Sequence, residues 1–308
     1  MSNTLFTEEG VGLHKFLEFA MKNILDKTMK WIFITCGFFT IAVVLIITGF
    51  LLVNGLPGIR EVGFFNFIFG NTWRSTGDNP QFGILPLLLS SIFGTFAAIL
   101  VGVPIALFTA IFLSKVAGRR TGGVVNTVVE LLAGIPSMVY GFIGLIVLVP
   151  FVRTTFNLNH GATLLSAIVV LAIMILPIVI NVSRMALDAV PKKYEEASYA
   201  LGATKMETIF KVCIPTAKSG IAAGVVLGIG RAIGEAMAVM MVAGNVANMP
   251  NLFSPVTFLT TAIASELRYA AGGSLHRNAL FSIGLVLFVF ILIINLTLNF
   301  ALKRGTKV

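Results

Sequence analysis

The stretch WIFITCGFFTIAVVLIITGFLLV, residues 31–53, carries no charged side chain over its whole length. A helix needs about 20 mostly apolar residues to cross the hydrocarbon core of a bilayer, so this stretch predicts a transmembrane helix. Five further apolar runs follow, at residues 83–114, 124–151, 161–183, 219–246 and 278–302. Because these runs are long and unbroken rather than short and alternating, they predict an all-α polytopic membrane bundle with six transmembrane helices.

The composition of the whole chain agrees with this class. Of its 308 residues, 57% are hydrophobic and only 11% are charged, whereas a soluble domain carries about a quarter of its residues charged. A soluble enzyme, a disordered protein and a small secreted scaffold are therefore excluded. The two cysteines, Cys36 and Cys213, do not make a disulfide framework, and the three histidines show no metal-ligand spacing.

The basic residues orient the chain in the membrane. The net charge is +9, and 16 of the 22 Lys and Arg residues fall in the N-terminal segment, the 114–123 and 184–219 loops and the C-terminal tail. Since positive residues accumulate on the cytoplasmic side, both termini are expected in the cytoplasm. The positive charge therefore gives the orientation, and no nucleic-acid partner is expected.

Three regions are expected along the chain. Residues 1–30 predict a cytoplasmic amphipathic segment, residues 31–302 a six-span membrane domain, and residues 303–308 a cytoplasmic tail. The first prediction rests on apolar residues that recur at helical spacing among charges: Leu13, Phe16, Leu17, Ala20 and Ile24.

The cytoplasmic loop at residues 184–219 has the most unusual sequence. Residues 192–201 predict a short helix that Gly202 ends, as glycine does at a helix C-terminus. Thr204, with Glu207 three residues later, resembles a capping box that starts a second helix, expected to stop near Pro215. Two short helices at an angle predict a compact knob that docks into a groove on a soluble partner.

The same loop resembles that of a known family. Glu196-Ala197-Ser198, three residues, Gly202, nine residues and then Val212-Cys213-Ile214-Pro215 resemble the EAA loop of ABC importer permeases, in which EAA, three residues, G and nine residues precede I-x-L-P. Ser198 and Val212 depart from that pattern. The resemblance implies a type I ABC importer permease (MetI-like) fold, in which this loop is the coupling helix on the ATPase subunit.

No phosphate-binding loop of the form G-x-x-x-x-G-K-[ST] occurs in the chain. If ATP drives the protein, ATP and Mg²⁺ must therefore bind partner ATPase subunits. No cofactor and no enzymatic chemistry are expected on this chain.

Three ionisable residues fall inside the predicted spans: Glu130, Arg231 and Glu235. Each costs roughly 2.5–3.5 kcal/mol at the centre of a membrane helix and is a functional candidate for that reason. Arg231 and Glu235 are four residues apart, so they can pair on one helix face as a neutral structural unit. Alternatively, Arg231 offers its planar guanidinium to an oxyanion such as phosphate, and Glu235 holds it in place. Glu130 either pairs with Arg231 or is protonated.

Glycines recur around this pair. Gly220, Gly224 and Gly228 are spaced by four residues, as are Gly230 and Gly234. Small residues at this spacing predict that neighbouring helices approach closely.

A second resemblance narrows the family. Residues 228–241, GIGRAIGEAMAVMM, look like the fifth span of phosphate ABC permeases, and residues 129–141, VELLAGIPSMVYG, are similar to the third. Trp73 followed by FGILP at residues 82–86 resembles the PstC type rather than its PstA partner. The likeness covers most of residues 73–302.

This resemblance implies a permease subunit of a bacterial phosphate importer in the inner membrane, with Arg231, Glu235 and Glu130 along the substrate pathway. It also implies three kinds of partner: a homologous permease, two ATPase subunits and an extracytoplasmic phosphate-binding protein. The outer loops 54–82 and 247–277 would bind the phosphate-binding protein.

Other functions remain open. The nearest alternatives are a permease for another oxyanion, such as sulfate or molybdate, and the partner phosphate permease. An ion-coupled secondary transporter or channel would use the three intramembrane charges as a relay, but it needs no coupling knob and often shows internal repeats. An assembly subunit without a pathway would not need an intramembrane Arg.

Overall fold

A computed structural model describes residues 5–305, and the side chains of residues 26–297 and 300. Within this part of the chain, six helices are long and apolar enough to cross a membrane: 26–62, 85–116, 137–155, 164–188, 205–234 and 275–297. The all-α class and the six spans are confirmed, although the extents of two predicted spans, the third and the fifth, are wrong.

The chain divides into two units, residues 1–53 and 54–308. Helix α1 (Leu5–Val62) makes up the described part of the first unit, and its residues from 54 onward belong to the second. The helix continues without a break through the predicted span. Its large apolar side chains face outward, for example Phe38 and Phe39, as expected for a helix in contact with lipid. The structure does not describe the side chains of residues 1–25 or any part of residues 306–308. The amphipathic character of the N-terminal segment and the cytoplasmic tail therefore stay predictions.

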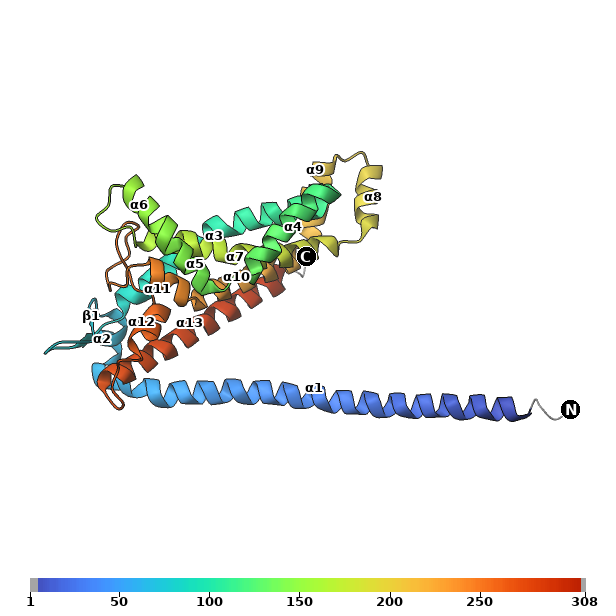
Figure 1. Cartoon of the computed structure of the whole chain (residues 1–308), viewed down its shortest axis with the longest axis horizontal. Helices are drawn as coiled ribbons and strands as arrows, with labels where there is room; N and C mark the ends of the chain where they lie inside the picture. Colours follow the sequence, from blue (N-terminus) through green and yellow to red (C-terminus); the bar gives the residue numbers. More distant parts are fainter. Residues whose placement is uncertain (1–4, 306–308) are drawn as a thin grey trace. The chain divides into compact units, whose positions relative to one another are not determined.

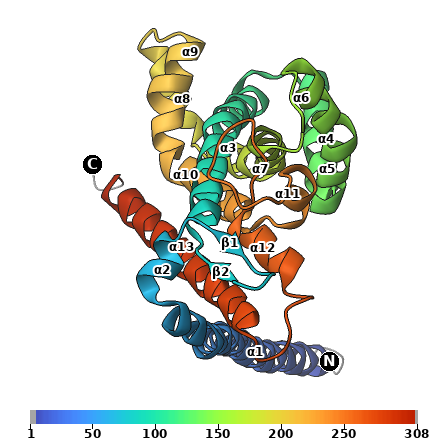
Figure 2. The same ribbon diagram turned by 90° about the vertical axis from the view of Figure 1, so that its left-hand side faces the viewer.

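Helix α7 (Leu164–Asp188) forms the centre of the second unit, between α3 (Leu85–Ile111) and α10 (Ile214–Gly234). Figure 2 shows it enclosed by the other helices of the unit. Gly224 faces Val182 and Gly228 faces Val179, both on α7, so these glycines let α10 approach closely. By contrast, a Cβ atom at Gly230 would have no described atom within 4 Å. The predicted glycine packing thus holds for one face of α10 and is wrong for the other.

The third predicted span, residues 124–151, is wrong as a single helix. It is broken at Ile135 and Pro136, which separate α4 (Arg119–Gly134) from α5 (Ser137–Ile143). Proline disfavours helical geometry in the residue before it, and Ile135 is accordingly extended. The π turn η2 (Gly144–Leu148) and α6 (Val149–Thr155) complete the membrane-length helix.

The fifth predicted span is also wrong at both ends. The helix starts at α9 (Lys205–Thr208) and continues through the π turn η3 (Ile209–Cys213) into α10, so Pro215 does not end it. Pro215 has no backbone N–H to donate within the helix. The helix accommodates it because Pro215 lies in the first turn of α10, directly after the wider hydrogen-bond spacing of the π turn. At the far end α10 stops at Gly234, and α11 (Met237–Val242) follows after an extended Glu235.

Short elements lie at the two ends of the second unit (Figure 1). One end holds the π turn η1 (Phe112–Val116), α8 (Lys192–Ala200) and α9. The other end holds the elements α2 (Phe64–Phe69), β1 (Trp73–Arg74), β2 (Gln81–Phe82), α12 (Leu259–Glu266) and the start of α13 (Leu275–Gly305).

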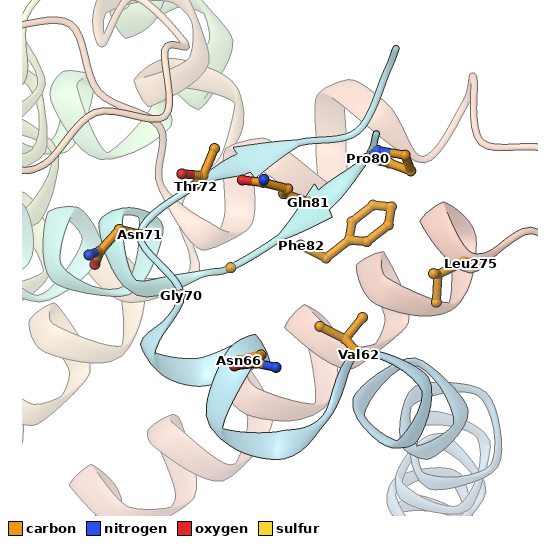
Figure 3. Close-up of a pocket in the computed structure, with 10 residues that line it drawn as sticks. Val62, Asn66, Gly70, Asn71, Thr72, Pro80, Gln81, Phe82 and Leu275 are labelled. Carbon is orange, nitrogen blue, oxygen red and sulfur yellow. The ribbon is translucent and has the colours of Figure 1, made fainter. Parts of the chain in front are cut away.

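The antiparallel hairpin of β1 and β2 is fixed to the bundle through Glu266. The indole nitrogen of Trp73 donates to one carboxylate oxygen of Glu266 at 2.9 Å, and the other oxygen lies 2.8 Å from the His276 ring. Beside the hairpin lies a cavity of 440 Å³, whose lining includes Asn66, Asn71 and Gln81 (Figure 3).

Candidate functional site

Three helices surround a cavity of 250 Å³, which we call the central cavity. Its lining includes Leu132 and Ala133 from the last turn of α4, Pro177 and Asn181 from α7, and Arg231 from the last turn of α10. Both α4 and α10 end within a few residues of this lining, at the breaks described above. Interrupted helices of this kind form binding sites in many membrane transporters, because their free backbone ends and polar side chains meet at membrane depth.

Arg231 is the cationic group of the central cavity. Its side chain is exposed and makes no hydrogen bond or ion pair with any described residue. A cation in the last helical turn is favoured by the helix dipole. The guanidinium therefore keeps its five N–H donors available, in the fork geometry that matches an oxyanion.

Glu235 is not the helical partner of Arg231 that its spacing predicts. Because α10 ends at Gly234, Glu235 is extended, and one of its carboxylate oxygens accepts the Ala238 N–H at 3.0 Å. Its carbonyl oxygen accepts the Thr260 hydroxyl at 2.8 Å. Glu235 thus holds the start of α11, and among the described residues no ion pair joins it to Arg231.

Glu130 lies on α4 and outside the lining of the central cavity. Its carboxylate accepts the Asn126 amide at 2.6 Å, and Asn126 in turn accepts from Arg184 on α7. Arg184 also pairs with Asp188 at 3.5 Å. The structure therefore places Glu130 in a polar network between α4 and α7, and pairs it with Asn126 rather than Arg231.

Helices α8 and α9 form the predicted knob, which we call the coupling knob (residues 192–208). The helix, its glycine stop and the capping box are all confirmed. Gly202 has φ +84°, a backbone conformation that favours glycine, and Thr204 and Glu207 cap each other reciprocally. Ser198 and Thr208 share a hydrogen bond of 2.9 Å that joins the two helices.

The other residues predicted for this loop occupy different environments. Glu196 and Ala197 are exposed on α8, whereas Ile214 and Pro215 lie in the first turn of α10, beyond the coupling knob.

The knob also carries features that the sequence analysis missed. Large apolar side chains are exposed on it and just beyond it, and Leu201 is 89% exposed. Further examples are Tyr194, Tyr199, Met206 and Phe210. Exposed apolar side chains gathered at one end of a protein mark an interaction surface.

A second missed feature is an ion pair between Lys115 of η1 and Glu195 of α8, at 2.7 Å, with side chains 11% and 22% exposed. No sequence signal links two residues 80 positions apart.

Two polar residues were missed: Asn181 in the lining of the central cavity, and Tyr140 outside that lining. Asn181 lies in the apolar run 161–183, and a lone amide in such a run was the available signal. The Tyr140 hydroxyl donates to the Leu132 carbonyl at 2.7 Å, so it satisfies a backbone acceptor at the end of α4. Among the described residues, no group of His, Cys, Asp or Glu is arranged to hold a metal ion.

The chain is similar to a protein family, to individual permeases and to a solved structure. Residues 102–306 match the family model of the binding-protein-dependent transport system inner membrane component. The chain is 40% identical over 273 residues to the probable ABC transporter permease protein YqgH of Bacillus subtilis, covering 86% of this chain and 88% of that protein. It is 36% identical over 260 residues to the phosphate transport system permease protein PstC of Mesorhizobium japonicum, covering 78% and 79%.

Among solved structures, an inward-facing MetNI methionine ABC transporter matches with a TM-score of 0.55 at 21% identity, over 73% of this chain and 95% of that chain. This similarity confirms the MetI-like permease fold.

Proposed function

Because the chain belongs to the family of binding-protein-dependent transport system inner membrane components, we propose that it is the permease subunit of an ATP-driven importer of inorganic phosphate. It would form half of the translocation pathway, and a homologous permease would form the other half. The similarity to PstC proteins over most of the chain supports phosphate as the substrate.

The observation that carries the proposal is the unpaired guanidinium of Arg231 in the central cavity. An uncompensated cation at membrane depth is costly, so its retention calls for an anionic partner. A tetrahedral oxyanion supplies two acceptor oxygens in the plane of the guanidinium and so gains two charge-assisted hydrogen bonds. In this proposal Glu235 positions the broken end of α10, and Glu130 lies beside the pathway in the network between α4 and α7.

ATP hydrolysis is proposed on separate ATPase subunits, which would carry the ATP and Mg²⁺. The coupling knob is their proposed docking site, because its exposed apolar side chains suit a protein groove. Closure of the ATPase subunits would push α8, and the Lys115–Glu195 ion pair would pass the movement to the end of α3. The central cavity would then open alternately to the two sides of the membrane.

The chain is a multi-pass membrane protein, and its proposed orientation follows from its basic residues. Residues 1–30, the coupling loop 184–219 within the permease domain 31–302, and the tail 303–308 would face the cytoplasm, as positive residues do. The loops 54–82 and 247–277 would face outward and receive a phosphate-binding protein.

The test is phosphate uptake by cells whose importer carries Arg231→Gln. We expect uptake to fall at least tenfold, and Arg231→Lys to be intermediate because it keeps the charge but loses the planar fork. Unchanged uptake in Arg231→Gln would remove Arg231 from the mechanism. If the further change Glu235→Gln restored uptake, the defect would be an unpaired carboxylate instead of a lost oxyanion site.

Two further measurements separate the alternatives. Competition of labelled phosphate uptake by sulfate and by molybdate tests the oxyanion. Co-purification tests the class: ATPase subunits are expected to purify with this chain, and full transport activity without them would identify a secondary transporter.

A further inference from the structure

We propose that Asn181 binds the translocated oxyanion together with Arg231 in the central cavity. This inference rests on the proposed function, since it concerns the same cavity. Asn181 lines the cavity from α7, whereas Arg231 lines it from α10.

The first argument is the unsatisfied amide. Asn181 is half-buried in a membrane-spanning helix, yet its side chain makes no hydrogen bond with any described residue. The fully buried polar side-chain atoms that lack a partner among the described residues are Ser90 Oγ and Ser183 Oγ, so the Asn181 amide is instead accessible from the cavity that it lines. Asn181 and Arg231 are thus two unpaired polar side chains on one cavity, and a ligand that binds both would satisfy them together.

The second argument is the rigidity of this position. Asn181 lies on α7, which packs closely against both α3 and α10. One turn earlier, Pro177 lines the same cavity, and it has no N–H to donate to the Ile173 carbonyl. The amide is therefore held on a well-packed helix, one turn after a proline that leaves one backbone carbonyl without its helical donor. Binding sites held by well-packed elements keep their geometry most accurately.

The third argument is chemical complementarity. Arg has five donors and no acceptor, so it cannot accept the hydrogen bond of a protonated oxygen of an oxyanion. Phosphate keeps a hydroxyl near neutral pH, and that hydroxyl needs an acceptor. The Asn181 amide supplies one acceptor oxygen and two N–H donors. Arg231 and Asn181 together therefore supply donors for the charged oxygens of an oxyanion and one acceptor for its hydroxyl.

The cavity has room for such a ligand. Its volume of 250 Å³ equals that of roughly eight liquid waters. A five-atom tetrahedral anion fits there with part of its hydration shell. The carboxylate of Glu235 does not compete as the acceptor, because it lies outside the lining and already holds Ala238.

The experiment uses the complete importer, with partner permease and ATPase subunits, in proteoliposomes supplied with ATP and saturating phosphate-loaded binding protein. Asn181→Leu removes both hydrogen-bonding functions at similar size, Asn181→Gln keeps the amide, and Asn181→Asp keeps the shape but replaces the donors with a negative charge. Asn295→Leu is the matched control, because Asn295 is also half-buried in a membrane-spanning helix but lies outside the lining of the central cavity. Rates are expressed per assembled complex.

We expect Asn181→Leu to lower the maximal rate of phosphate uptake tenfold to hundredfold, as for loss of a hydrogen bond to a charged group. Asn181→Asp should also lower it, because it replaces both N–H donors with a negative charge beside the anion, while Asn181→Gln and Asn295→Leu should stay within a few-fold of the parent chain. The concentration of loaded binding protein that gives half the maximal rate should not change, since docking occurs elsewhere.

Two results would overturn the role of Asn181: a parental rate in Asn181→Leu, or a parental rate in Asn181→Asp. If Asn181→Leu does not assemble, the Asp and Gln variants decide the question. Both outcomes leave phosphate transport by the parent importer intact. A parent importer that moves no phosphate refutes the proposed function instead, so the two failures are distinguishable.

Discussion

Packing between α10 and α7 predicts opposite effects for two glycine substitutions only two residues apart. In Gly228→Ala the new methyl would lie 2.7 Å from Cγ2 of Val179, which is fully buried. Carbon atoms pack best at about 3.5–4.0 Å, so the helices must separate by about 1 Å, because a valine in a helix cannot rotate its methyl away. In Gly230→Ala the methyl enters open space.

The expected magnitude follows from comparing the two variants. Each gains about 1 kcal/mol from replacing glycine by alanine within a helix, so this gain cancels in the comparison. Overpacking costs about 1–3 kcal/mol and applies to Gly228→Ala alone. Gly228→Ala should therefore be about 1–3 kcal/mol less stable than Gly230→Ala, which should itself be slightly more stable than the parent chain.

Thermal unfolding of the purified chain in one detergent measures this difference. By the scaling of folded domains, each kcal/mol shifts the midpoint by about 2–4 °C, so the two variants should differ by several degrees. Equal midpoints for the two variants, or a Gly228→Ala chain more stable than Gly230→Ala, would refute the assigned packing of α10 on α7.

Two further predictions concern the coupling knob. Gly202→Val should uncouple ATP hydrolysis from transport, since φ +84° is strained for a β-branched residue, whereas Gly202→Asn should keep most of the coupling. The measurement is the ratio of ATP hydrolysed to phosphate transported. A parental ratio in Gly202→Val would contradict this prediction. Lys115→Glu should lower ATP-driven transport severalfold, because it breaks the ion pair with Glu195. The added change Glu195→Lys should restore part of the lost transport. Equal transport by the single and double variants would show that the ion pair passes no movement from α8 to α3.

Features that depend on local chemistry were predictable from the sequence. The six spans follow from apolar length, and the coupling knob follows from a glycine stop and a capping box that act over four residues. The break at Pro136 was predictable in principle from the proline itself. It was missed because the apolar run continues on both sides of the proline. The break at Glu235 had none, because it is held by Thr260 from a distant helix and by the turn that follows.

The candidate site also contains residues that were predictable from the sequence and residues that were not. Arg231 was predictable, since a charge in an apolar run needs no structure to be noticed. Its relation to Glu235 was not, because a spacing of four implies a face only if the helix continues. Glu130 was placed in the pathway by its depth, yet the structure pairs it with Asn126. Asn181 gained its significance only when two helices distant in sequence met around one cavity.

The anchoring of the hairpin also has a consequence for biosynthesis. Trp73 donates its hydrogen bond to Glu266, 193 residues later in the chain, and His276 follows from the next helix. While the ribosome is still making the central helices, Glu266 does not yet exist, so the indole N–H hydrogen-bonds to water and the hairpin lacks its anchor on the bundle. The end of the molecule that contains the hairpin is therefore completed last, after residue 276 has emerged, and a nascent chain stopped before Glu266 would leave it open to proteases.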